Sequence, residues 1–228
     1  MKNTIIFDVD GTLLNTEPLY INAWIEAGPR FGYEIGREVP LKTRGVSVQL
    51  CVREFQKAYG DDFPFHEIRA ERIRIANELF YSMPKEELLM EGVQETLEAL
   101  KEEGYSLAIA SSTEINDTIE HLRHAGILEY FSSIVGGDMV EKGKPNPDPF
   151  LLAASMIGAK PSDCIVIGDS PNDILTAKAA GMEMILIPDV SPATDEQKAY
   201  CSAVLTSMKD ALPVIHAITE SSRGKETV

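Results

Sequence analysis

The stretch Thr4-Ile5-Ile6-Phe7-Asp8-Val9-Asp10-Gly11-Thr12-Leu13 contains two carboxylates directly after a short run of β-branched and aromatic residues. Such a run predicts a buried strand over Thr4–Phe7. Asp8 and Asp10 then stand where the chain leaves the sheet, which is the usual place for chemistry in open α/β folds. The segment therefore predicts the first strand of an α/β sheet and an acidic functional site at its end.

Two carboxylates two residues apart share one face of an extended chain, because strand side chains alternate between faces. If the extended conformation continues, Asp8 and Asp10 offer oxygen ligands to a divalent cation. Burying two acids beside Ile-Ile-Phe is costly without a cation, which argues against two solvated strand-end residues. A calcium-binding loop does not fit, because it needs a ligand at Thr12, glycine at Leu13 and glutamate at Leu19. The pattern indicates metal-assisted catalysis.

Composition limits the partners of the 228-residue chain. It has 36 acidic and 21 basic residues, and the net charge of −15 disfavours duplex nucleic acid and anionic membranes as partners. Its three cysteines, Cys51, Cys164 and Cys201, lack metal-ligand spacing, which favours reduced thiols and a cytoplasmic location. No segment approaches ~20 uninterrupted apolar residues, so we expect neither export nor membrane insertion.

From about Val93 the sequence alternates between helical and strand patterns. Helices are expected over 93–103, 114–125, 149–156 and 172–180, and strands over 107–110, 133–135, 164–167, 184–187 and 203–205. With Thr4–Phe7, this alternation predicts an α/β fold, a doubly wound parallel sheet with right-handed crossovers and helices on both faces. Ser221–Val228 is expected to form a frayed polar tail.

Residues 15–90 differ in character from the rest of the chain. The charged, amphipathic segments 17–27, 46–59 and 66–81 contain no convincing strand. We therefore predict two parts, a catalytic core of residues 1–14 and 91–228 and an all-helical cap subdomain of residues 15–90. The hinges are expected just after Leu14 and around 84–90, where the helical periodicity lapses.

Four short segments fall where strands end: Asp8–Thr12, Ala110–Thr113, Gly143–Asp148 and Gly168–Asp173. Together they contain the groups that phosphoryl transfer needs. One carboxylate can attack phosphorus and a second can move a proton. A hydroxyl and an ammonium can hold the phosphoryl oxygens, and further acids can bind a metal ion that offsets the phosphate charge.

In order, spacing and placement these segments resemble the haloacid dehalogenase (HAD) superfamily of phosphohydrolases, and the resemblance covers nearly the whole chain. The helical insertion after the first segment resembles the cap of HAD subfamily IA. The resemblance implies an HAD-like Rossmannoid core and a phosphomonoester hydrolase of the EC 3.1.3 type. It also implies Mg²⁺ as cofactor and an aspartyl-phosphate intermediate.

The resemblance further implies catalytic and metal-binding roles at matching positions. Asp8 would be the nucleophile, and Asp10 would protonate the leaving alcohol and then activate water. Asp169 would complete the Mg²⁺ site with the Asp8 carboxylate and the Asp10 backbone carbonyl, and Asp173 would support it from nearby or through water. The alternative for Asp173 is a first-turn acid favoured by a helix dipole.

Phosphate binding is implied in the same way for two side chains and two backbone amides. Ser111 would bind a phosphoryl oxygen, and Lys144 would pair with both the phosphoryl group and the nucleophile. The amides of Val9 and Gly11 would also reach the phosphoryl oxygens. Taken singly, Lys144 is a solvated lysine and Ser111 a helix-capping hydroxyl, so both roles depend on the other segments.

Departures from particular relatives narrow the activity. Dehalogenases lack the second aspartate, so Asp10 favours phosphate-ester chemistry. The beginning of the insertion, 15–20, is similar to β-phosphoglucomutase and its sugar-phosphate phosphatase relatives. The mutases, however, have a histidine at Tyr20, an arginine for a second phosphate at Val48 and a lysine at Glu114, and all three are missing. We therefore expect a phosphatase of a small phosphorylated metabolite, such as a sugar phosphate.

Several alternatives stay open at this point. One is a β-phosphoglucomutase-type phosphosugar mutase. Another is a non-catalytic or receiver-like phospho-signalling protein, although receivers are about half as long and need no acid at Asp10. Tyr20 and Arg44 are candidate substrate contacts, and a helix-packing tyrosine and an exposed arginine are equally good interpretations. We expect a monomer or weak dimer.

Overall fold

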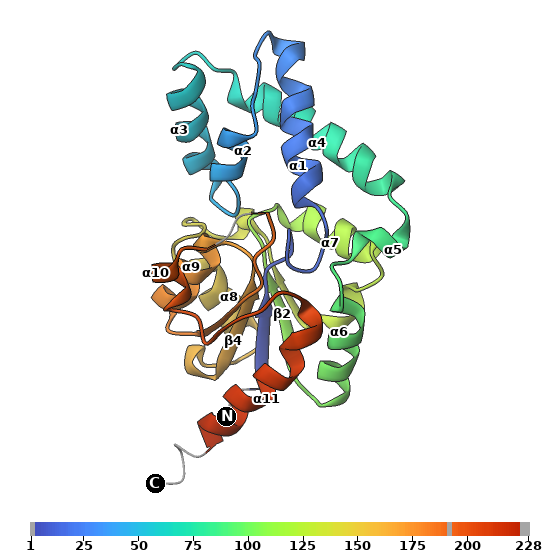
Figure 1. Ribbon diagram of the computed structural model, residues 1–228, viewed down its shortest axis with the longest axis vertical. Helices are drawn as coiled ribbons and strands as arrows, with labels where there is room; N and C mark the ends of the chain where they lie inside the picture. Colours follow the sequence, from blue (N-terminus) through green and yellow to red (C-terminus); the bar gives the residue numbers. More distant parts are fainter. Residues whose placement is uncertain (1–2, 191–192, 224–228) are drawn as a thin grey trace.

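A six-stranded parallel sheet forms the centre of the computed structural model, which describes residues 3–190 and 193–223 (Figure 1). The strands are β1 (Thr4–Phe7), β2 (Ser106–Ala110), β3 (Ser133–Val135), β4 (Cys164–Gly168), β5 (Glu183–Leu186) and β6 (Ala203–Val204), in the spatial order β3-β2-β1-β4-β5-β6. The strand that the opening sequence predicts therefore lies between β2 and β4 and is buried throughout.

Helices cover both faces of this sheet. Because side chains alternate along β1, Ile5 and Phe7 pack in one apolar cluster with α6 (Val93–Glu102), α7 (Ile115–His124) and α11 (Ala211–Arg223). Ile6 faces the other way and packs with α8 (Asp148–Met156) and α9 (Pro171–Ala180). The predicted doubly wound α/β fold is confirmed. The chain also forms α10 (Asp195–Lys198) and the 3₁₀ turns Gly28–Phe31, Leu128–Tyr130, Gly137–Met139, Pro161–Asp163 and Met208–Asp210.

The strand register determines which residues meet at the carboxyl edge. Phe7 lies opposite Ile109 of β2 and Ile167 of β4. Asp8 directly follows Phe7. Strand β2 ends at Ala110 and strand β4 at Gly168, each one residue beyond the residue that lies opposite Phe7. The residues that follow these three strands therefore leave the sheet side by side.

Residues 15–90 form helices and no strand. The helices are α1 (Glu17–Ala27), α2 (Glu38–Lys42), α3 (Val48–Tyr59), α4 (Phe65–Ser82) and α5 (Lys85–Leu88). Helices α1–α4 lie together beyond the carboxyl edge of the sheet (Figure 1) and share an apolar cluster around Trp24, Phe55 and Phe65. We call α1–α4 the helical unit. The division of the chain into a core and a cap stays a prediction.

Two short connections join the helical unit to the rest of the chain, and they pair with each other. The Asn15 N–H donates to the Leu88 carbonyl at 2.9 Å, and the Met90 N–H donates to the Leu13 carbonyl at 2.9 Å. An isolated antiparallel bridge joins Leu14 to Leu89. Both predicted hinge segments are therefore held in one small hydrogen-bonded crossing.

The carboxyl end departs from the sequence interpretation. Residues 221–223 complete α11, so the expected tail is wrong for them, and 224–228 lie outside the described residues. Pro213 occupies the first turn of α11, where its missing N–H removes no helical hydrogen bond. Among the helices of the described residues, none has the length and apolar character needed to cross a membrane.

Candidate active site

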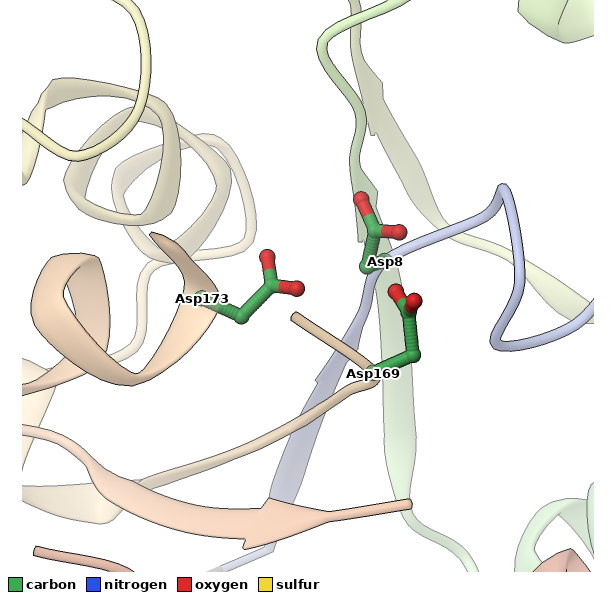
Figure 2. A group of neighbouring side chains, drawn as sticks. All are labelled: Asp8, Asp169 and Asp173. Atoms are coloured by element: carbon green, nitrogen blue, oxygen red, sulfur yellow. The ribbon is translucent and has the colours of Figure 1, made fainter. Parts of the chain in front are cut away.

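Three buried carboxylates meet at the carboxyl edge of the sheet. Asp8 follows β1, Asp169 follows β4, and Asp173 comes from the first turn of α9 (Figure 2). One oxygen of each lies within 4.8 Å of the others. The order of the strands, rather than proximity along the chain, brings these acids together.

Lys144 supplies a buried positive charge beside this group. It belongs to the loop before α8, and its side chain is 0% exposed. Its Nζ donates to Asp8 Oδ1 at 2.6 Å and to Asp173 Oδ1 at 2.7 Å. Burial alone would lower the pKa of Lys144, but the charges of Asp173 and Asp8 outweigh burial and raise it above the ordinary value. The lysine therefore stays protonated between two acids.

Burial and mutual repulsion disfavour the ionised forms of these carboxylates. Burial, with the charges of Asp173 and Asp10, raises the pKa of Asp8 to about 7 against the opposing effect of Lys144. Burial and the neighbouring acids Asp173 and Asp8 also raise the pKa of Asp169. A set of buried, mutually repelling oxygen ligands has a strong electrostatic preference for an added cation.

Asp8 and Asp10 line the same cavity, but Asp10 stands outside the three-carboxylate group, so a shared cation-binding face for the two stays a prediction. The chain turns at Gly11, whose φ is 84°, and a bridge forms between Asp10 and Leu14. The Asp10 carboxylate instead accepts hydrogen bonds from Thr16 Oγ1 at 2.7 Å and Thr113 Oγ1 at 2.8 Å. Its side chain therefore lies apart from the three-carboxylate group, and a metal contact through the Asp10 backbone carbonyl stays a prediction.

The predicted phosphate-binding groups lie at the same edge. Ser111 is buried, and its Oγ accepts a hydrogen bond from the Thr113 N–H at 2.9 Å. The Gly11 N–H already donates to the Leu14 carbonyl at 2.8 Å, so it would have to exchange that bond for a phosphoryl oxygen. In the described part of the chain, the Val9 N–H has no such acceptor.

Asp173 has both carboxylate oxygens engaged. One pairs with Lys144, and the other accepts from the Ser170 N–H at 3.1 Å and the Ser170 hydroxyl at 2.6 Å. Ser170 is also the N-cap of α9, with Pro171 in the first turn. Asp173 therefore positions Lys144. Because both of its oxygens are engaged, Asp173 fits a supporting role toward a metal ion rather than direct ligation.

Arg44 reaches the site from the loop after α2. Its guanidinium pairs with Asp169 and, at 2.8 Å through Nε, with Glu17. Burial raises the pKa of Glu17 to about 7 against the opposing charge of Arg44. Sequence reasoning named Arg44 as a candidate substrate contact and missed Glu17. The glutamate occupies the first turn of α1, where an acid is ordinarily explained by the helix dipole.

Tyr20, which the sequence named as a candidate substrate contact, meets Arg72 of α4, which the sequence did not single out. Tyr20 is buried, and the Arg72 guanidinium lies 4.0 Å from its ring centroid. Burial and the nearby Asp10 charge raise the pKa of the Tyr20 hydroxyl well above its usual value. Arg72 gave no sequence signal, because charged residues recur throughout α4 and are normally solvated.

Two cavities lie between the helical unit and the sheet edge. The first, about 130 Å³, contains Asp8 and Asp10 at one side and Tyr20 and Arg72 at the other. The second, about 390 Å³, is lined by the phosphate-binding candidates and by the loop before α3, with Ser47, Gly143, Ser111 and Lys144 among its walls. The two cavities share Val48, Ser112 and Glu114 as lining residues.

The donor set fits a hard divalent cation. Asp8, Asp169 and Asp173 offer only carboxylate oxygens, which Mg²⁺ prefers over nitrogen or sulfur ligands. Lys144 and Arg44 together do not neutralise the three acids and Glu17, so added positive charge is favourable. The residues present therefore fit a metal ion of this class.

A parallel α/β sheet with such an acidic edge and a buried lysine brings together the groups that phosphoryl-transfer chemistry needs. The sequence pattern described as "Haloacid dehalogenase-like hydrolase" matches residues 5–187. The chain belongs to this family, as its motifs predicted.

Individual relatives agree with this membership. The chain is 30% identical to the "Phosphorylated carbohydrates phosphatase" of Thermotoga maritima, over 95% of this chain and 98% of the relative. It is 31% identical to "Pyrophosphatase PpaX" of Halalkalibacterium halodurans, over 93% of this chain and 96% of the relative. The structure of β-phosphoglucomutase from Clostridium difficile shares the fold with a TM-score of 0.81 at 19% identity, covering 96% of this chain and 99% of that one. The protein is therefore a phosphatase-class enzyme of this family.

Proposed function

We propose that the protein is a Mg²⁺-dependent phosphatase that hydrolyses a small phosphomonoester, such as a sugar phosphate, through an aspartyl-phosphate. The carrying observation is the Lys144 ammonium held 2.6 Å from Asp8 beside a three-carboxylate cluster. A lysine in this place favours the anionic form of Asp8 and attracts a phosphoryl group to it. The relatives named above, which act by name on phosphorylated carbohydrates and on pyrophosphate, support a small phosphate compound.

In the proposed first step an Asp8 oxygen attacks phosphorus, and the bond to the leaving alcohol breaks. Asp10 gives the departing oxygen its proton. In the second step water attacks the aspartyl-phosphate, Asp10 removes a proton from that water, and inorganic phosphate and free Asp8 carboxylate result. The hydroxyls of Thr16 and Thr113 orient both Asp10 oxygens, at 2.7 and 2.8 Å, and so support this proton-shuttling role.

The proposed metal would be held by Asp8 and Asp169, with Asp173 in support. When bound, Mg²⁺ supplies positive charge that offsets the phosphoryl oxygens and favours ionised carboxylates. Ser111 and Lys144 would hold phosphoryl oxygens from the side of the larger cavity, whose wall they form. The helical unit would act as a cap that excludes water while the phosphoryl group is transferred.

Mutagenesis of the two aspartates tests this mechanism. With Mg²⁺ and p-nitrophenyl phosphate, we expect Asp8→Asn to remove turnover by several orders of magnitude, because the amide is not a nucleophile. Asp10→Asn is expected to slow turnover at least ~100-fold, as for loss of general acid–base catalysis. Asp62→Asn, at an exposed position, is the matched control and should keep wild-type rates. Wild-type turnover in purified Asp8→Asn would refute the nucleophile.

A separate assay distinguishes the phosphatase from a mutase. Val48 offers no charge for a second phosphate, and Glu114 carries the opposite charge to the lysine expected of a mutase; it pairs with Arg69 of α4 at 3.3 Å. We therefore expect no conversion of β-glucose 1-phosphate to glucose 6-phosphate when glucose 1,6-bisphosphate is supplied. Rapid conversion would favour the mutase. A single labelling event without turnover would instead favour a receiver-like protein.

A further inference from the structure

One arginine of α4, Arg72, is half-buried and has no acidic partner among the described residues. Arg69 and Arg74 of the same helix pair with Glu114 and with Glu71 and Glu78, respectively. Arg72 forms no ion pair with any residue that the structure describes, and its Nε is buried without a hydrogen-bond partner. A buried Nε–H donor is costly unless something accepts a hydrogen bond from it.

The Tyr20 ring provides a partner for only part of the Arg72 guanidinium. The guanidinium stacks on the ring face at 4.0 Å, a contact that engages its plane and leaves its in-plane N–H groups unused. Asp10 and Glu17 attract its charge from a distance, and Arg69 repels it. The other two arginines of the cavity are occupied, Arg44 by Asp169 and Glu17 and Arg69 by Glu114.

The position of Arg72 relates it to the leaving group of the substrate. Asp10 lines the 130 Å³ cavity, whereas Ser111 and Lys144 line only the neighbouring one. With the phosphoryl group at Asp8, the alcohol that Asp10 protonates must extend into the smaller cavity. Arg72 lines that same cavity from α4. A small leaving group therefore has its far end within the part of the molecule that contains the unpaired guanidinium.

We propose that Arg72 is a specificity-determining residue that binds a second oxyanion on the leaving group, so that the enzyme prefers small phosphomonoesters with a carboxylate or second phosphoryl group over neutral ones. This inference rests on the proposed phosphatase function and deepens it. A planar guanidinium with free donors matches an oxyanion geometrically.

Matched substrate pairs test the preference in the wild-type enzyme. The carboxylate pair is 2-phosphoglycolate and 2-hydroxyethyl phosphate, and the phosphoryl pair is glucose 1,6-bisphosphate and glucose 6-phosphate. We expect kcat/KM to be about 10- to 100-fold higher for the charged member of at least one pair, as for one charge-assisted hydrogen bond. The pair that shows the preference identifies the bound oxyanion as a carboxylate or as a phosphoryl group. Equal values within both pairs would overturn the inference.

Variants of α4 then assign the preference to the arginine. In Arg72→Met we expect the charged-to-neutral ratio of kcat/KM to fall toward 1, chiefly through KM. Arg72→Lys should recover part of the ratio, because it keeps the charge and loses the fork of donors. Arg74→Met, on the same helix but exposed, should leave the ratio unchanged. A fall of both substrates by the same factor in Arg72→Met would show a merely structural role and overturn the inference.

The design separates this inference from the proposed function. Turnover of p-nitrophenyl phosphate that needs Asp8, combined with no preference for either charged substrate, would uphold the phosphatase and refute the oxyanion site. Absence of any turnover would refute both. If Arg72→Met does not fold, the wild-type ratios and Arg72→Lys still decide the question.

Discussion

Lys144 carries the buried positive charge that pairs with two carboxylates of the site. It is fully buried, and both of its acidic partners are buried too, so water stabilises none of the three charges. The arrangement is favourable only as a set. Removal of one member of such a group leaves charges that nothing nearby compensates, which is more damaging than never having buried the group.

Substitution of this lysine should therefore destabilise the fold as well as the activity. We expect Lys144→Met to lower the free energy of unfolding by about 3–5 kcal/mol at pH 8, and by less at pH 5.5, where Asp8 takes up a proton. Urea unfolding at the two pH values measures the difference. Lys142→Met, two residues away and exposed, is the control. If both variants unfold alike at pH 8, the buried charge set does not stabilise the fold as argued.

At the residue scale, the order of the motifs along the sequence predicted which residues meet at the sheet edge. Asp8 and Lys144 are 136 positions apart, yet motif order placed both at the sheet edge, where they make contact. The hydrogen bond from Thr113 to Asp10 could not be predicted, because the two residues are 103 positions apart. Arg72 could not be found either, since its lack of an acidic partner is a property of the packed helical unit.

At the scale of elements, the end of β4 and the start of α9 approach unusually closely. A Cβ on Gly168 would lie 2.7 Å from Asp173 Cγ and 2.8 Å from Asp173 Oδ2. The carboxylate cannot easily retreat, because Lys144 and Ser170 hold its two oxygens. The absence of a side chain at Gly168 thus lets α9 present Asp173 to the lysine.

A methyl group at this position should disturb stability and catalysis together. We expect Gly168→Ala to cost about 1–3 kcal/mol of unfolding free energy, as other overpacked positions do, and to lower turnover at least ~10-fold by displacing Asp173 and with it Lys144. Gly36→Ala is the matched control, since a Cβ there meets nothing within 4 Å. Thermal unfolding and p-nitrophenyl phosphate turnover measure the two effects. Control-like behaviour in both would contradict the close approach.

Most long, periodic elements were predictable, but α11, with 13 residues, was not. Helices α1 and α9 and all six strands follow from apolar spacing and from capping residues such as Ser170 and Gly181. The short helices α2 and α5 were not predicted, because four or five residues are too few for a period of 3.6 to show. Their existence depends on packing within the helical unit and at the connections.

At the scale of the whole molecule, the excess of acidic residues matters most in the candidate active site, where the acids are buried. Burial holds the pKa of Asp8 at about 7 against an ordinary value of 3.8, and that of Glu17 at about 7 against 4.5. Between these limits the native protein binds more protons than the unfolded chain. The contribution of both groups to stability is therefore full at low pH and is lost as pH rises through the interval from about 4 to 7.

Magnesium should oppose this loss, because its carboxylate ligands must give up their protons to bind it. We therefore expect 5 mM Mg²⁺, roughly the excess needed for a weak site, to raise the unfolding temperature of EDTA-treated protein more at pH 8 than at pH 5.5. Differential scanning fluorimetry at both pH values measures the rise, and Asp169→Asn should abolish most of it at pH 8. An equal rise at the two pH values would mean that Mg²⁺ binds elsewhere, away from the carboxylates that carry the raised pKa values.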